Sequence, residues 1–114
     1  MSDTTTTTQE TAVRAVFGRL AHRRYEPRLH GTRGTYRFDI EGAGTWGLTI
    51  DAGSLTVSED PGEADCVIRC GAADFVGVAE GTLNLIVAAL QGRVRVTGDL
   101  ALGVSFNRLL PVTP

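Results

Sequence analysis

The sequence predicts one α/β (α+β) domain with five strands and about four helices, in the order α-β-β-β-β-α-α-β-α. Three observations predict this class. Apolar residues recur with helical spacing near both ends of the chain and between residues 72 and 91. They alternate with polar residues between Tyr36 and Ile50. The length of 114 residues, 42% of them hydrophobic, suits a single domain that can bury its own core.

The first helix is expected to begin near Gln9. Residues 2–8 are polar and include an unbroken run of threonines, so residues 1–8 are predicted to be a disordered tail and residues 9–114 the folded domain. Proline disfavours helical backbone in the residue before it, so the helix should end before Pro27. One helical stripe is apolar over Val13, Val16, Phe17, Leu20 and Ala21.

Four strands should follow. Tyr36, Phe38 and Ile40 alternate with charged residues, and a second alternating segment follows a glycine-containing turn at 42–44. A third strand is expected around residues 55–57 and a fourth over 64–70. Cys66 and Cys70 share one face of the fourth strand, about 13 Å apart at ~3.3 Å per residue. That separation excludes a mutual disulfide, so they are expected to be buried neutral thiols.

Two helices, a short strand and a closing helix complete the order. The helices are predicted over 72–80 and 82–91, and the second is apolar on nearly all sides. Gly92 should end it in a left-handed conformation. A strand over 93–97 comes next, and Asp99 is expected to cap the closing helix. Its apolar stripe comprises Leu102, Phe106, Leu109 and Leu110.

Charge and composition narrow the class of partner. The net charge is −2, yet residues 1–40 hold seven arginines against four acidic residues, whereas the remainder holds four against nine. This basic front could dock on an anionic membrane, or it could be the solvated face of a helix. Aromatic residues make up only 6%, which argues against nucleic-acid binding. No long apolar run or signal-peptide pattern occurs, so a cytoplasmic location is expected.

Five segments carry a resemblance to a known family. They are residues 36–40 (YRFDI), 46–51 (WGLTID), 64–68 (ADCVI) leading to Asp74 and Phe75, 80–84 (EGTLN) and 92–100 (GRVRVTGDL), in this order and spacing. In these segments, from about Gly34 to Leu110, the chain resembles the sterol carrier protein 2 family, whose domains bind lipids and sterols in an apolar tunnel. Leu85 stands where that family often has a proline, and the segment before Gly34 is not recognisable.

The resemblance implies a five-stranded mixed β-sheet covered by helices and enclosing an apolar cavity that carries a lipid, sterol or other apolar small molecule. The residues alone favour a completely filled core over an open cavity, and the resemblance reverses that preference. The side chains predicted to line the cavity are Phe38, Trp46, Leu48, Phe75, Leu83, Ile86, Val87, Leu90, Leu102, Phe106 and Leu109.

Catalytic and metal chemistry have little support in the sequence. His22 and His30 lie on either side of a proline with no ligand cluster beside them, so no metal, cofactor or catalytic residue is predicted. An alternative is a small cavity enzyme, for example a cyclase, or an accessory factor acting on a hydrophobic intermediate of secondary metabolism. A further alternative is an interaction module with an apolar dimer face, so the chain is expected to be a monomer or a homodimer. Polar groups that could serve the enzyme alternative are Tyr36, Trp46, Asn84 and Asn107.

Overall fold

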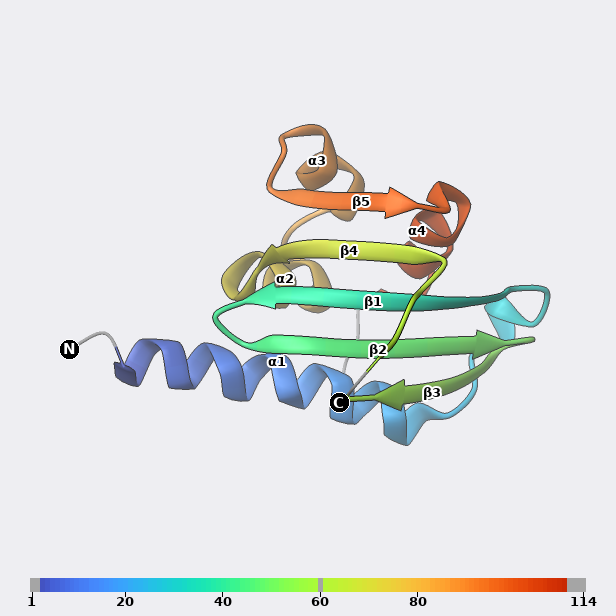
Figure 1. Cartoon of the computed structure of the whole chain (residues 1–114), viewed down its shortest axis with the longest axis horizontal. Helices are drawn as coiled ribbons and strands as arrows, with labels where there is room; N and C mark the ends of the chain where they lie inside the picture. Colours follow the sequence, from blue (N-terminus) through green and yellow to red (C-terminus); the bar gives the residue numbers. More distant parts are fainter. Residues whose placement is uncertain (1–2, 60, 111–114) are drawn as a thin grey trace.

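The computed structural model describes residues 3–59 and 61–110 (Figure 1). It contains a five-stranded sheet, four α-helices and one short 3-10 turn, η1 (Pro27–Leu29). The strands are β1 (Arg33–Glu41), β2 (Gly44–Asp51), β3 (Ser54–Ser58), β4 (Cys66–Gly71) and β5 (Val94–Gly98). The helices are α1 (Asp3–Arg23), α2 (Ala72–Glu80), α3 (Leu85–Leu90) and α4 (Leu100–Asn107).

The sheet is mixed, as predicted. Its strand order is β3-β2-β1-β4-β5. Strand β1 pairs antiparallel with β2 and parallel with β4, and the outer strands β3 and β5 are antiparallel to their neighbours. The chain therefore leaves one edge after β3 and returns beside β1 to begin β4 (Figure 1). The predicted element order α-β-β-β-β-α-α-β-α is confirmed.

One face of the sheet is covered and the other is polar. In β1, Tyr36, Phe38 and Ile40 are buried, whereas the residues between them are more exposed. The long helix α1 packs along β3 and against α2, while α4 packs on β4 and β5 and α3 packs on β5. This alternation is typical of a sheet with helices on one side.

Aromatic rings fill the layer between the sheet and the two helices α1 and α2. The Phe17 ring stacks on Trp46 with 4.9 Å between ring centroids, and on Phe75 with 5.2 Å. Phe38 meets Phe17 edge-on at 5.3 Å. All four side chains are at most 5% exposed. Such rings bury about 150–250 Å² each, so this layer is a filled core.

A buried carboxylate joins the end of α1 to the sheet. Glu26 accepts hydrogen bonds from the backbone N–H and the guanidinium of Arg28, and pairs with Arg23 at 3.0 Å. Its own backbone N–H donates to the Gly53 carbonyl in the β2–β3 turn. The hydrogen bond from the Arg28 side chain lowers the pKa of Glu26 to about 2, although burial acts in the opposite direction.

Two predicted helix boundaries differ from the structure. Helix α1 begins at Asp3 rather than near Gln9, so residues 3–8, predicted as a tail, belong to the helix. Threonine costs only a few tenths of a kcal/mol in a helix, and no glycine or proline interrupts the run. Helix α3 begins at Leu85 rather than Thr82, because Asn84 is extended and caps it. The bounds of α2 agree with the prediction, whereas residues 1–2 and 111–114 lie outside the described residues.

Candidate ligand-binding groove

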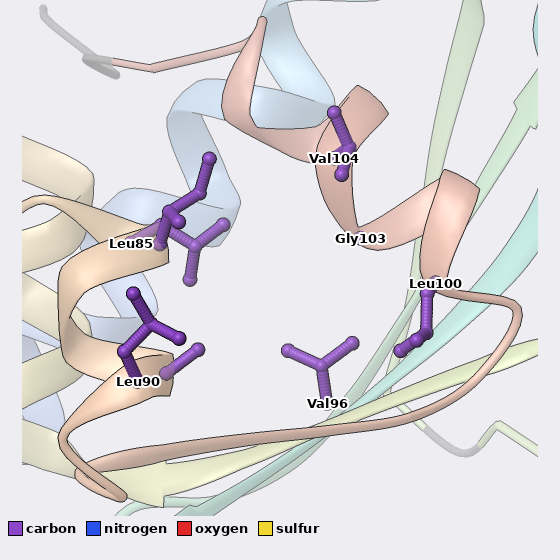
Figure 2. A pocket seen from close by; sticks show the side chains of 8 residues that line it. Leu85, Leu90, Val96, Leu100, Gly103 and Val104 are labelled. Carbon is purple, nitrogen blue, oxygen red and sulfur yellow. The ribbon is translucent and has the colours of Figure 1, made fainter.

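An apolar groove lies between α3, β5 and α4. Its volume is about 240 Å³. Figure 2 shows side chains of α3 on one side, those of α4 on the other, and Val96 of β5 between them. The groove is lined by Leu85, Ile86, Ala89, Leu90, Val96, Leu100, Gly103 and Val104.

Each of the two helices beside the groove has two apolar faces. In α3, Leu85 and Ala88 are buried, and Ile86 and Leu90 are exposed along the groove. In α4, Leu102 and Phe106 point into the core, while Leu100 and Val104 line the groove. A helix packed on one neighbour needs a single apolar stripe. The second apolar face of each helix therefore remains for the groove.

A glycine allows α4 to approach β5. A Cβ atom built at Gly103 would lie 2.9 Å from the Val96 Cγ1 atom, closer than carbon atoms normally pack. Both residues line the groove. The missing side chain thus brings the floor and one wall of the groove together.

Side-chain caps hold the ends of α3 and α4. The Asn84 Oδ1 atom accepts a hydrogen bond from the Val87 backbone N–H at 3.0 Å. Asp99 accepts from the Ala101 and Leu102 backbone N–H groups at 3.0 and 3.3 Å, which confirms its predicted capping role. The Tyr36 hydroxyl donates to the Leu102 carbonyl at 2.6 Å, so a buried hydrogen bond also ties α4 to β1.

The groove has uncharged walls and is open to solvent. No ionisable side chain lines it among the described residues. Six large hydrophobic side chains are exposed among all the described residues, and four of them line the groove. Leu90 is 84% exposed and Leu100 is 62% exposed. Clustered exposure of this kind is typical of interaction sites rather than of an ordinary surface.

A second hollow of about 240 Å³ lies beside the groove. Leu85 is common to the linings of both. The second hollow is more polar, because two asparagines from different segments face it. It is lined by Val78, Gly81, Leu83, Asn84, Leu85, Asn107 and Leu110.

The structure divides the eleven side chains predicted to line a cavity into several groups. Ile86 and Leu90 line the groove, and Leu83 lines the second hollow. Val87 is exposed on α3 but does not line the groove. The other seven are buried in the core: Phe38, Trp46, Leu48, Phe75, Leu102, Phe106 and Leu109.

Six residues of the groove were not predicted from the sequence. One signal could have found three of them. Leu100 and Val104 are four residues apart and lie off the stripe of α4 that contains Leu102 and Phe106, with Gly103 between. The others carry no such signal, because an aliphatic residue in a buried strand or helix has the same pattern. The six are Leu85, Ala89, Val96, Leu100, Gly103 and Val104.

The polar residues considered for chemistry lie apart from the groove. Cys66 and Cys70 are free and buried, and burial raises their pKa values to about 11 and about 12. They are neutral thiols, as predicted. His22 and His30 are exposed. Within residues 3–59 and 61–110, no group of three or more potential metal ligands occurs.

Most arginines of the predicted basic front form ion pairs with acidic residues. The ion pairs are Arg14–Glu10, Arg23–Glu26, Arg28–Glu26, Arg33–Asp51 and Arg37–Asp39. Docking of this segment on an anionic membrane stays a prediction.

No helix in the described part of the chain is long and apolar enough to cross a membrane.

Several longer proteins contain a segment similar to this chain. Hydroxysteroid dehydrogenase-like protein 2 from Danio rerio is 34% identical over 83 residues, which cover 69% of this chain and 20% of that protein. The protein of the same name from Homo sapiens is 29% identical over 86 residues, covering 72% of this chain and 21% of the relative. The chain thus spans about a fifth of these relatives.

Solved structures share the fold. The sec-alkylsulfatase Pisa1 from Pseudomonas sp. matches with a TM-score of 0.68 and 25% identity, over 83% of this chain and 16% of the enzyme. Sterol Carrier Protein 2 Like 2 from Aedes aegypti matches with a TM-score of 0.63 and 17% identity, over 88% of this chain and 97% of that chain. The profile of one family also matches residues 16–111, which include every strand of the sheet. The chain therefore belongs to the SCP-2 sterol transfer family.

Proposed function

We propose that this domain binds and carries an apolar small molecule, and that the groove between α3, β5 and α4 holds the apolar part of that molecule. The observation that carries the proposal is the groove itself, whose walls are aliphatic and whose rim exposes Leu90 and Leu100 to solvent. Concave apolar sites with few polar groups are the usual form of a small-molecule site.

The family supports a lipid or sterol as the class of ligand. Its description names sterol transfer. A solution structure of a related Aedes aegypti protein, with a TM-score of 0.63 and 18% identity, is described as palmitated. These descriptions belong to the relatives, and they make a long hydrocarbon the first ligand to test on this chain.

The size of the groove sets the scale of the binding energy. A hollow of about 240 Å³ has room for about eight groups the size of a water molecule or a methylene group. At about 0.8 kcal/mol for each buried methylene, the gross transfer free energy is about 6 kcal/mol, before the cost of immobilising the ligand is deducted. We therefore expect modest affinity and little selectivity among alkyl chains.

Binding accounts for the groove better than catalysis does. A cyclase would need a polar group placed to move a proton or stabilise charge. The walls of the groove hold no ionisable side chain among the described residues, and the Tyr36 hydroxyl is engaged with the Leu102 carbonyl. These features favour a carrier over an enzyme.

Two neighbouring residues of α3 provide a matched test. Ile86 and Val87 are 47% and 45% exposed, but only Ile86 lines the groove. Binding of a dodecyl chain attached to a nitrobenzoxadiazole fluorophore would be measured by fluorescence titration. Ile86→Glu should weaken binding roughly tenfold or more, because a carboxylate in an apolar site loses its hydration. Val87→Glu should leave the affinity within about twofold.

Thermal unfolding of both variants is the control for folding. Equal weakening by the two substitutions would place the probe elsewhere on the surface. No binding of the probe by the wild-type protein would overturn the proposed function. A concentration-dependent mass in place of binding would instead favour the apolar rim as a dimer face.

A further inference from the structure

The second hollow beside the groove offers hydrogen bonds and no charge. Its lining residues include two asparagines and no ionisable side chain. Arg108 and Glu80 are sequence neighbours of lining residues, but neither lines the hollow. The hollow therefore differs in chemistry from the groove, with which it shares Leu85.

The asparagine amides have hydrogen-bonding capacity left over. The Asn84 Oδ1 atom is used by the Val87 N–H, which leaves the Asn84 amino group as a donor. The Asn107 side chain makes no hydrogen bond with any other described residue, and it is half-buried. A group bound between the two amides could both accept and donate a hydrogen bond.

The two hollows are large enough to act together. Each has a volume of about 240 Å³, and Leu85 is common to both linings. Together they provide a volume within the range of about 300–1,000 Å³ that is common for small-molecule sites. The groove is aliphatic, while the second hollow presents amides.

From this arrangement we infer that the ligand is an amphiphile with an uncharged head, such as a hydroxyl, ketone or amide, whose alkyl part lies in the groove and whose head lies between Asn84 and Asn107. The lining of this hollow holds no cation to pair with a carboxylate or phosphate, whereas its amides suit an uncharged group that donates and accepts hydrogen bonds. The inference rests on the proposed function, because the groove must hold the alkyl part.

A competition experiment compares heads on one tail. Decan-1-ol and decanoate displace the same fluorescent dodecyl probe from the wild-type protein at about pH 7.5, where the carboxyl group is ionised. We expect the alcohol to bind about tenfold more tightly than decanoate. The ratio of the two affinities is insensitive to small changes in the fraction of folded protein.

Substitution of one amide then locates the head. Asn107→Leu preserves the approximate size and should reduce the affinity for decan-1-ol about two- to tenfold, the usual range for one hydrogen bond. Its affinity for the alkyl probe should not change. Gln91→Leu is the matched control, because this exposed amide ends α3 and lines neither hollow.

The outcomes separate the two proposals. If the probe binds normally but decanoate binds as tightly as decan-1-ol, the uncharged-head inference is wrong and the proposed function stands. The same conclusion follows if Asn107→Leu leaves the ratio of the decan-1-ol and decanoate affinities unchanged. If the probe does not bind the wild-type protein, the groove is not a ligand site and both proposals fail.

Discussion

The two pairs of helices that cover the sheet use apolar residues in opposite ways. Helices α1 and α2 lie over a layer in which Phe17 stacks on Trp46 and Phe75, and this layer is filled. Helices α3 and α4 flank a hollow walled by aliphatic side chains at the β5 edge (Figures 1 and 2). Apolar composition alone therefore does not distinguish a core from a ligand site.

Helix length and side-chain size explain the difference. Helix α1 has 21 residues, and its Phe17 ring packs with the rings of the sheet and of α2. Helix α3 has only six residues, of which Leu85 and Ala88 are buried. Two short helices with small aliphatic side chains cannot close the space above Val96. The groove is thus what remains where the covering helices are short and no aromatic ring lines the space between them.

The largest expected change in stability is that of a substitution in the aromatic layer, and it tests whether this layer is filled. Phe38 is fully buried and touches Phe17, Phe75 and Phe106. Phe38→Ala should reduce the free energy of unfolding by about 3–5 kcal/mol, since it leaves a cavity in a packed core. Urea denaturation followed by Trp46 fluorescence measures this. A loss below about 1 kcal/mol would mean that the layer has spare room and that the comparison is wrong.

A second prediction concerns the carboxylate that fixes α1 to the filled half. Glu26→Gln should cost about 1.5–3 kcal/mol at neutral pH, because it removes the negative charge that pairs with Arg23 and Arg28 and weakens the hydrogen bonds that the carboxylate accepts. The pKa of Glu26 is lowered to about 2 in the folded protein, from an ordinary value of about 4.5. The stabilisation is therefore fully present above about pH 4.5 and is lost as the pH falls toward 2.

Melting temperatures of the wild-type protein and of Glu26→Gln at several pH values test whether the stabilisation by Glu26 falls on acidification. The difference between them should be constant above pH 5 and should shrink on acidification, because protonated glutamic acid and glutamine are both neutral. A difference that grows in acid would contradict the assignment of the pKa to this network. Ligand binding in the groove should be unaffected, since Glu26 lines neither hollow.

The sequence was sufficient to predict the sheet and most helices, because alternation and helical spacing depend on local burial. The limits of α2 and the cap at Asp99 follow from local chemistry in the same way. The start of α1 was missed because threonines disfavour a helix only weakly.

The position of the groove could not be predicted from the spacing of apolar residues in the sequence. Phe38 and Leu90 are both apolar residues in apolar patterns, yet one is fully buried and the other is 84% exposed. Whether a side chain meets a ring or a hollow depends on which elements face each other and on their length. These facing elements are known only from the three-dimensional structure, in which α3 and α4 pack on β5 at the edge of the sheet.

The smallest expected effect on stability completes the comparison. Leu90→Ser should change the free energy of unfolding by less than about 0.5 kcal/mol, because the side chain is already largely in water. The same substitution should weaken binding of the fluorescent dodecyl probe about three- to tenfold, since a bound chain covers Leu90 and removes it from water. Urea denaturation and fluorescence titration are done on one protein preparation. A clear loss of stability would show that Leu90 is buried in solution, by a second copy or by closure of α3 on α4. Unchanged binding with unchanged stability would mean that the exposed rim takes no part in holding the ligand, and the hollow would then have to be reached from the side of Leu85.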